Sequence, residues 1–444
     1  MDWLRSTASE QGRAILAGLV SPVDLTEAYL DAIGNHPDGG LIYARLLPER
    51  ARAQAIAAHD RARAGLRRGV LDGVPLGWKD NIDSQGAATE AGSALLKGRM
   101  PDRDAVVLAQ ADAAGLVALG KTHMTELAFS GLGLNPVTAT PPNALDPALA
   151  PGGSSSGAAV SVALGLAAGA VGTDTGGSIR LPAAWNGLVG FKPTPGAVPM
   201  QGVVPLCPRF DVAGPIARST EDCAEIFAAI TARRAPDLGD VSPRDLRLLV
   251  LDGIPFEDGR AAPLAAFEEA VDALGRAHAQ ITRAAPPCVA EAMALSPLLF
   301  APEAYGTWSA HIENAPEAMY PPILTRFRAG AAVSAPEYVA AWQTLERLRG
   351  VWAGLVAGFD AVILPTSPIL PPDRDSLLAD ADFFAAENLL TLRNTRIANL
   401  FGLPAISLPT ARPACGIMAM GAAGDDLRLL RCARAMELAL SAQG

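Results

Sequence analysis

The sequence GTDTGGSIR, at residues 172–180, places three glycines before a single serine, Ser178, with one acid before it and one base after it. A second loop of small residues, PGGSSSG at residues 151–157, precedes it in the chain. A helix of about ten residues followed by a strand would bring two such loops to the same edge of a sheet. The two loops therefore favour an α/β fold in which the backbone closely surrounds one serine.

Strand and helix patterns also alternate outside the two loops. The run at residues 105–116 has the pattern of a helix, and short apolar runs predict buried strands at residues 73–82, 117–123, 246–253 and 361–368. We therefore predict an α/β fold, as a single large domain over residues 1–444. Its central twisted mixed β-sheet is surrounded by helices.

The domain divides by pattern into four parts. We predict N-terminal helices at residues 1–65 and an α/β core at residues 66–240. A helix-rich variable region follows at residues 241–360, and a C-terminal part at residues 361–444 returns to the core. The helix-rich region either caps the site or uses its aromatic residues for ordinary packing. The apolar run at residues 158–171 is shorter than the roughly 20 residues of a membrane span. It indicates a buried core helix.

Composition limits the classes of partner. Half of the 444 residues are hydrophobic and the net charge is −10, which disfavours nucleic acid and anionic membranes. The five cysteines form no CxxC pair, and the histidines form no HExxH motif. We therefore expect no metal and predict that the cysteines are buried in a reducing cytoplasm. The first sixteen residues contain no apolar region of the kind found in secretory signals.

The loop around Ser178 has the composition of a nucleophile site. Glycines before a serine allow a tight turn whose backbone N–H groups can point at a developing oxyanion. Thr175, Gly176, Gly177 and Ser178 fit that need. A phosphate-binding turn or a simple tight turn is the alternative for this loop taken alone. The PGGSSSG loop alone resembles a linker, but it leads directly into an apolar run.

Lys79, in DGVPLGWKDNID at residues 72–83, ends a predicted strand. A lysine in this position usually reaches outward to solvent. In a dry pocket, however, a lysine can lose its proton and act as a base, which requires its pKa to fall by roughly three units from about 10.4.

These three motifs together resemble the amidase signature family of serine hydrolases. The likeness covers residues 72 to 219, includes GPIARST at residues 214–220, and extends to the N-terminal helices and to ANLFGLPAISLP at residues 398–409. The PGGSSSG loop at residues 151–157 differs from the common GGSSGG pattern at Ser156. The segment after residue 409 also departs from the family, which affects the substrate pocket and not the three motifs.

The resemblance implies a Ser-cisSer-Lys triad. Ser178 would attack the carbonyl carbon, Ser154 would pass the proton, and Lys79 would receive it and return it to the leaving amine. The peptide bond of Ser154 with Gly153 or Ser155 is expected to be cis. No cofactor or metal is implied.

Further roles follow from the same resemblance. Backbone N–H groups of Thr175, Gly176, Gly177 and Ser178 would form the oxyanion hole. Asp174 and Arg180 would brace the loop, although contact with substrate is the alternative for both, and Ser155 would support the proton relay.

The substrate side is expected in the segment at residues 124–145, which lacks charge after Glu126. Leu127, Ala128, Phe129 and Ser130 are the predicted lining residues, and Leu132 and Leu134 would extend the apolar wall. Arg209, in the loop at residues 203–215, either selects acidic substrates or faces solvent.

We therefore predict hydrolysis of a neutral amide, anilide or carbamate (urethane) that carries an apolar or aromatic portion, through an acyl-enzyme on Ser178. One alternative is a glutaminase-type subunit of an amidotransferase complex; others are a short aliphatic amide hydrolase and a binding protein without activity. As partners we predict a small-molecule amide or carbamate, with no nucleic acid and no membrane, for a cytoplasmic monomer or homodimer.

Overall fold

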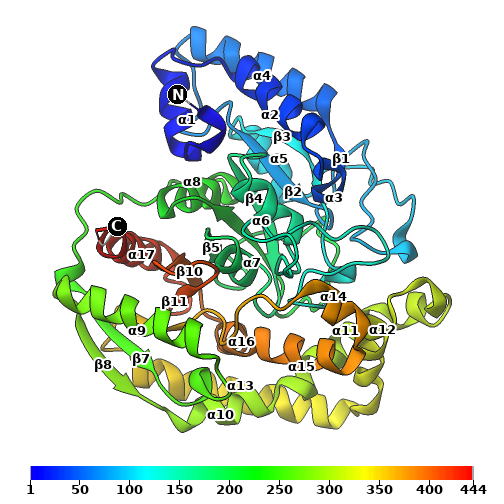
Figure 1. Ribbon diagram of the computed structural model, residues 1–444, viewed down its shortest axis with the longest axis vertical. Coiled ribbons are helices and arrows are strands. Elements are labelled where there is room, and N and C mark those ends of the chain that lie inside the picture. The colour runs from blue at the N-terminus through cyan, green and yellow to red at the C-terminus, as the bar shows by residue number, and fades with distance from the viewer. Residues whose placement is uncertain (1, 443–444) are drawn as a thin grey trace.

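The computed structural model describes residues 2–442, which form one α/β domain built on a mixed sheet of eleven strands (Figure 1). The strand order is β1-β3-β2-β4-β6-β5-β10-β11-β9-β7-β8. The strands are β1 (Tyr43–Leu46), β2 (Pro75–Lys79), β3 (Val117–Thr122), β4 (Gly169–Asp174), β5 (Val189–Lys192), β6 (Val212–Ala217), β7 (Arg247–Leu251), β8 (Gln280–Ala284), β9 (Ala361–Pro365), β10 (Ala405–Pro409) and β11 (Gly416–Met420).

The sheet combines parallel and antiparallel strand pairs. β2 lies between β3 and β4 and is parallel to both, so the three strands end on the same side. β4 and β6 are antiparallel, as are β5 and β10. β10 joins the two halves of the sheet, because it pairs with β5 on one side and with β11 on the other.

Helices cover the sheet and extend beyond it. They are α1 (Ala8–Leu16), α2 (Pro22–Asn35), α3 (Gly39–Ile42), α4 (Pro48–Arg63), α5 (Val106–Ala113), α6 (Ser156–Ala163), α7 (Arg180–Trp185), α8 (Thr220–Thr231), α9 (Ala261–Arg276), α10 (Pro287–Ala294), α11 (Ser296–Ile312), α12 (Pro321–Arg328), α13 (Ala335–Val356), α14 (Arg374–Ala379), α15 (Ala381–Thr391), α16 (Arg393–Leu400) and α17 (Asp426–Ser441). Figure 1 shows α1, α2 and α4 at one end of the molecule and α10 to α13 at the other, with α16 between that group and the core.

Local sequence explains where several elements begin and end. Ser21 caps α2 by accepting the N–H of Val23, and Pro22 occupies the first helical position. Gly165 follows α6 with a φ of +76°, a conformation that suits glycine, and the chain then enters β4. The central strands β2, β3 and β4 are buried along their whole length.

The single-domain α/β prediction is confirmed, and each of the four predicted apolar runs contains a strand: β2, β3, β7 and β9. The predicted core helix at residues 158–171 is wrong in its second half, because α6 ends at Ala163 and β4 begins at Gly169. The predicted helices of residues 1–65 are interrupted by β1, which forms because it pairs with β3.

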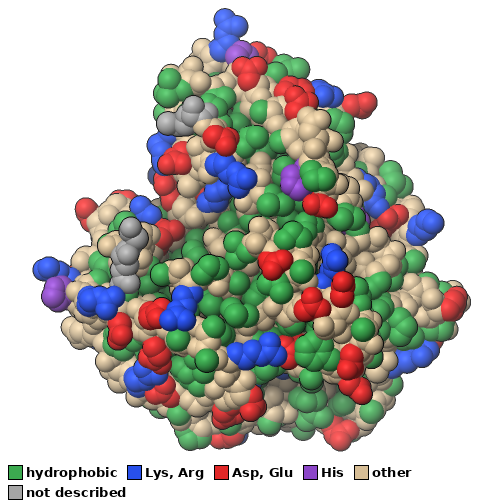
Figure 2. Space-filling model, viewed as in Figure 1, with side chains coloured by type: hydrophobic (Ala, Val, Ile, Leu, Met, Phe, Trp, Pro, Cys, Tyr) green, Lys and Arg blue, Asp and Glu red, His purple; other side chains and the backbone are tan. Residues whose placement is uncertain are grey.

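The surface mixes charges of both signs. On the face drawn in Figure 2, basic and acidic side chains are interspersed with hydrophobic ones. All five cysteines are buried and unpaired. Among residues 2–442, no helix is both long enough and apolar enough to cross a membrane.

Candidate active site

The serine loop connects the end of β4 to the start of α7 and is held by a buried ion pair. Asp174, the last residue of β4, accepts hydrogen bonds from the backbone N–H of Gly177 (2.8 Å) and of Ile179 (3.2 Å). Arg180 donates to the same carboxylate through Nε at 3.0 Å and Nη2 at 2.9 Å. Burial raises the pKa of Asp174, but the charge and hydrogen bonds of Arg180 outweigh it and lower the pKa to about 2.

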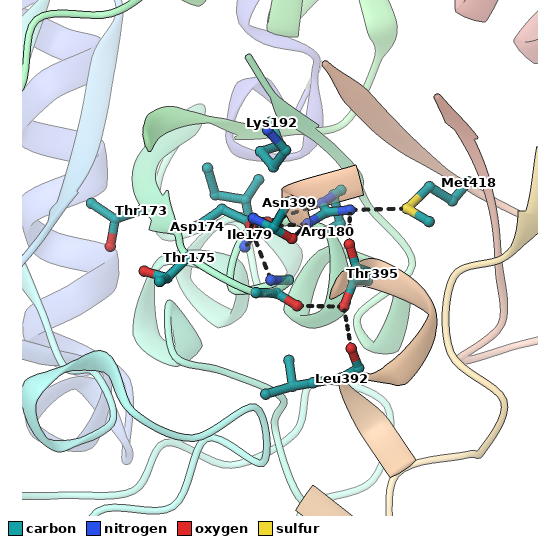
Figure 3. A network of polar contacts seen from close by, with 12 residues as sticks. Thr173, Asp174, Thr175, Ile179, Arg180, Lys192, Leu392, Thr395, Asn399 and Met418 are labelled. Atoms are coloured by element: carbon teal, nitrogen blue, oxygen red, sulfur yellow. Dashed lines mark hydrogen bonds and ion pairs between the residues drawn. The ribbon is translucent and has the colours of Figure 1, made fainter. Parts of the chain in front are cut away.

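Helix α16 braces this loop from the other side (Figure 3). Thr395 Oγ1 donates to the carbonyl of Gly176 at 2.7 Å, and Arg180 donates to the carbonyl of Thr395 at 2.7 Å. Asn399 accepts from Arg180 at 2.6 Å and donates to Asp174 at 2.9 Å. A Cβ on Gly177 would lie 2.1 Å from Thr395 Oγ1, so this position requires glycine.

Lys79 ends β2 and is fully buried. Its Nζ lies 2.8 Å from Ser154 Oγ and 2.8 Å from Thr173 Oγ1. Burial lowers the pKa of Lys79 to about 7, against the opposing effect of the negative charges of Asp174 and Asp211. A large fraction of this lysine is therefore neutral at neutral pH, and a neutral amine can accept a proton.

The second serine loop lies between Lys79 and β4. Ser154 is fully buried, and the Gly153–Ser154 peptide bond is cis. Ser155 Oγ donates to the carbonyl of Thr173 at 3.2 Å and accepts its N–H at 3.3 Å. Ser155 therefore ties this loop to the end of β4, beside Ser154.

Ser178 is 4% exposed and lines a cavity of about 290 Å³ together with Thr175 and Gly176. The polar contacts that begin at Lys79 reach Ser154, and no hydrogen bond among residues 2–442 extends them to Ser178. The structure thus brings Lys79 and Ser154 into direct contact, and it places Ser178 at the cavity wall.

Three peptide N–H groups of the loop have no acceptor within the described chain: those of Thr175, Gly176 and Ser178. The N–H of Gly177 is different, because it donates to Asp174. This corrects the sequence expectation for Gly177, whose N–H is occupied in holding the loop and is not directed to an oxyanion.

The cavity wall is largely apolar, as the sequence suggested for one of its sides. Ala128, Phe129 and Ser130 line it. Leu127 does not, because its side chain is 2% exposed and packs in the core. Arg209 also lies outside the lining: it is exposed, and its guanidinium stacks on Trp342 at 4.1 Å from the ring centroid. Further lining comes from the helix-rich region and the C-terminal part: Ser296, Pro297, Phe300, Ala301, Ala329, Val333, Leu389 and Leu392.

Sequence reasoning missed two arginines in that lining, Arg326 of α12 and Arg396 of α16. Neither lies in a recognisable motif, and both are far from Ser178 in the chain. Sequence reasoning also missed Thr173, which contacts Lys79, and Asn81, which donates to Thr173 Oγ1 at 3.1 Å. Asn81 stands two positions after Lys79, and this closeness in the chain was the one sequence signal that could have indicated its place in the site.

Comparison with known proteins assigns the chain. The Amidase family model matches residues 24–430. This chain belongs to the amidase family. As an amidase-family enzyme it acts on small amides and breaks their C–N bonds by hydrolysis.

Relatives of this amidase-family chain extend over nearly its full length. The 2-amino-5-chloromuconic acid deaminase of Comamonas testosteroni is 35% identical over 405 residues, which cover 89% of this chain and 87% of that protein. A glutamyl-tRNA(Gln) amidotransferase subunit from Anaeromyxobacter sp. (strain K) is 32% identical over 471 residues, with 96% and 95% covered. The native peptide amidase of Stenotrophomonas maltophilia has a TM-score of 0.82 at 29% identity, with 98% and 97% covered.

Proposed function

We propose that this enzyme hydrolyses an amide C–N bond through an acyl-enzyme on Ser178, with Ser154 and Lys79 as the proton relay. One observation carries the proposal: a buried lysine with a pKa of about 7 lies 2.8 Å from the hydroxyl of Ser154, beside the loop that holds Ser178. A lysine with its usual pKa would stay protonated at neutral pH and could accept nothing.

The reaction proceeds in two halves. Neutral Lys79 takes the proton of Ser154, Ser154 takes that of Ser178, and the Ser178 oxygen attacks the carbonyl carbon. The unpaired N–H groups of Thr175, Gly176 and Ser178 stabilise the oxyanion. The proton returns along the relay to the leaving amine as the C–N bond breaks. Water then attacks the ester of Ser178, which releases the acid and regenerates the serine.

Asp174, Arg180 and Ser155 are assigned supporting roles in this mechanism. Asp174 and Arg180 are buried, hold the serine loop and do not line the cavity. Ser155 fixes the loop of Ser154 against β4. These contacts favour bracing over direct contact with substrate for all three residues.

The apolar wall supports a substrate with an apolar or aromatic portion. Phe129, Phe300 and Val333 are among the side chains that would contact it. Anilides, carbamates and short aliphatic amides all remain within the chemistry of an acyl-enzyme on Ser178. The relatives are named for different substrates: one is a 2-amino-5-chloromuconic acid deaminase, and another is a glutamyl-tRNA(Gln) amidotransferase subunit.

The amidotransferase relatives make the glutaminase-type subunit the second candidate. Glutamine brings an ammonium group that requires an acidic partner. The lining residues include no Asp or Glu. This observation favours an independent hydrolase, which we propose acts in the cytoplasm as a monomer or homodimer.

Amine release from a panel of amides tests the proposal. The panel contains a short aliphatic amide, an anilide, an aryl carbamate and glutamine, each with wild type and with Ser178→Ala. We expect turnover of at least one member other than glutamine, and none by the variant. Turnover of glutamine alone would support the glutaminase-type alternative, and a fully active Ser178→Ala variant would remove Ser178 from the mechanism.

A further inference from the structure

Two arginines in the wall of the active-site cavity have no acidic partner. Arg326 and Arg396 come from different helices, α12 and α16, and both line the cavity that Ser178 lines. Among residues 2–442, neither guanidinium lies within ion-pair distance of a carboxylate or donates a hydrogen bond. Nε of Arg326 and Nη2 of Arg396 are inaccessible and unpartnered. By contrast, buried Arg180 contacts Asp174 at 2.9 Å.

An unpaired charge at such a position is unfavourable by itself. Both side chains are partly exposed, but the N–H groups that are withdrawn from water have no acceptor, and this is unfavourable. Arg326 makes a cation–π contact with Phe129, whose ring centroid lies 4.5 Å from the guanidinium carbon. Stacking on a ring face leaves the N–H groups at the edge of the guanidinium available to another acceptor.

The two charges lie close enough to affect each other. Burial lowers the pKa of Arg326, and the positive charge of Arg396 lowers it further, to about 9. Burial alone lowers the pKa of Arg396 to about 10. Both side chains remain protonated at neutral pH. The cavity therefore presents two positive charges and, in its lining, no negative one.

We propose that Arg326 and Arg396 bind a carboxylate of the substrate, so that the enzyme hydrolyses the monoamide of a dicarboxylic acid. This inference rests on the proposed amide hydrolysis at Ser178 and names the substrate class. The amide carbonyl lies at Ser178, the apolar chain lies along the wall, and the far carboxylate receives N–H groups from the two guanidiniums. An α-amino acid is excluded, because its ammonium would meet two cations and no acid. This replaces the neutral substrate expected from the sequence.

Matched substrates separate charge from shape. Glutaramate, the monoamide of glutaric acid, and 5-methylhexanamide differ in a terminal carboxylate against an isopropyl group of similar shape. We expect kcat/KM for glutaramate to exceed that for 5-methylhexanamide by about 100-fold. Succinamate and adipamate, each with its own isopropyl analogue, cover shorter and longer chains. Equal rates across every pair would overturn the carboxylate site and leave amide hydrolysis intact.

Substitution of each arginine assigns the preference to the site. Arg326→Met and Arg396→Met retain the length of the side chain and remove its charge. Each is expected to raise KM for the preferred monoamide by about 30-fold or more, with little change for the isopropyl analogue. Tm is expected to stay level or rise, because a partly buried charge without an acidic partner is removed. An equal loss on both members of a pair would show a structural role instead.

Arg209→Met is the matched control, because Arg209 is an exposed arginine outside the cavity lining. This variant is expected to leave unchanged the ratio of kcat/KM for a monoamide to kcat/KM for its isopropyl analogue. A fall in the ratio equal to that of Arg396→Met would contradict the assignment.

Binding of glutarate and adipate gives a readout that needs no turnover. Calorimetry on the Ser178→Ala variant is expected to detect binding of at least one of these dicarboxylates. The double variant Ser178→Ala, Arg396→Met is expected to lose that binding. Binding without turnover of any amide would uphold the carboxylate site and reject the proposed hydrolysis. Absence of binding, together with equal rates on matched substrates, would reject the carboxylate site.

Discussion

The two sides of the active-site cavity differ in how their polar groups are satisfied. On the strand side, Lys79, Ser154, Asp174 and Arg180 are buried and joined to one another or to neighbouring groups by hydrogen bonds. On the helical side, Arg326 and Arg396 have aromatic and apolar neighbours but no acidic partner. The strand side thus pairs its buried charges within the protein and leaves only loop N–H groups for a ligand, whereas the two arginines of the helical side gain an anionic partner only from a substrate. Chemistry and specificity are therefore separate parts of this molecule.

Ser178→Ala is expected to have the largest effect, because it removes the group assigned to attack the substrate. We expect kcat to fall by about 10⁴-fold or more with the fold unchanged, measured by amine release and circular dichroism. Ser161→Ala is the control, since Ser161 is buried in α6 and donates only to the carbonyl of Ala158. A comparable loss in that control would mean that the assay reports stability.

Asp174→Asn tests whether the strand side depends on its internal charges. The change leaves Arg180 buried without its counter-ion, which is expected to lower the free energy of unfolding by about 3–5 kcal/mol. Urea denaturation measures it. Asp102→Asn, which breaks an exposed pair with Arg103, is expected to leave the free energy of unfolding nearly unchanged, because solvent screens that pair. Equal changes in the free energy of unfolding for the two variants would mean that the buried pair of Asp174 and Arg180 does not stabilise the fold.

The pH dependence of kcat/KM tests the role of Lys79. The relay needs the neutral amine, and the pKa is about 7, so activity is expected to fall about tenfold per pH unit below 7 and to level off above 8. Initial rates between pH 5.5 and 9 measure it. Burial also lowers the pKa of Lys192 to about 7, so Lys192→Met is the control. Loss of the pH dependence in that variant would assign it to Lys192.

Thr395→Val tests the contact between the two sides and is expected to have the smallest effect. It removes the donor to the Gly176 carbonyl, which is expected to cost about 1 kcal/mol of stability and to lower kcat a few-fold with KM unchanged. Stopped assays and thermal melts measure both. Thr395→Ser keeps the hydroxyl and is expected to retain the wild-type kcat. A change in KM instead would place Thr395 in substrate binding.

What could be predicted from the sequence follows the same division. The strand side is encoded locally: Lys79, Ser154 and Ser178 stand in motifs whose glycines and small residues indicate a tight loop, and parallel strands bring such loops to one edge. The helical side comes from α11, α12, η7 (Ala329–Ala332), α15 and α16, whose contacts depend on tertiary packing. Arg326 and Arg396 have no local pattern that distinguishes them from surface arginines. The occupied N–H of Gly177 was equally inaccessible, because it depends on the rotamer of Asp174.

The position of β10 and α16 in the chain has a consequence for synthesis on the ribosome. The serine loop is made early, yet Thr395 and Asn399, which brace it, emerge more than two hundred residues later. β10, which joins the two halves of the sheet, follows them. In a nascent chain whose α16 has not yet emerged, the loop of the nucleophile therefore lacks the contacts of Thr395 and Asn399. The finished catalyst forms only when translation is nearly complete.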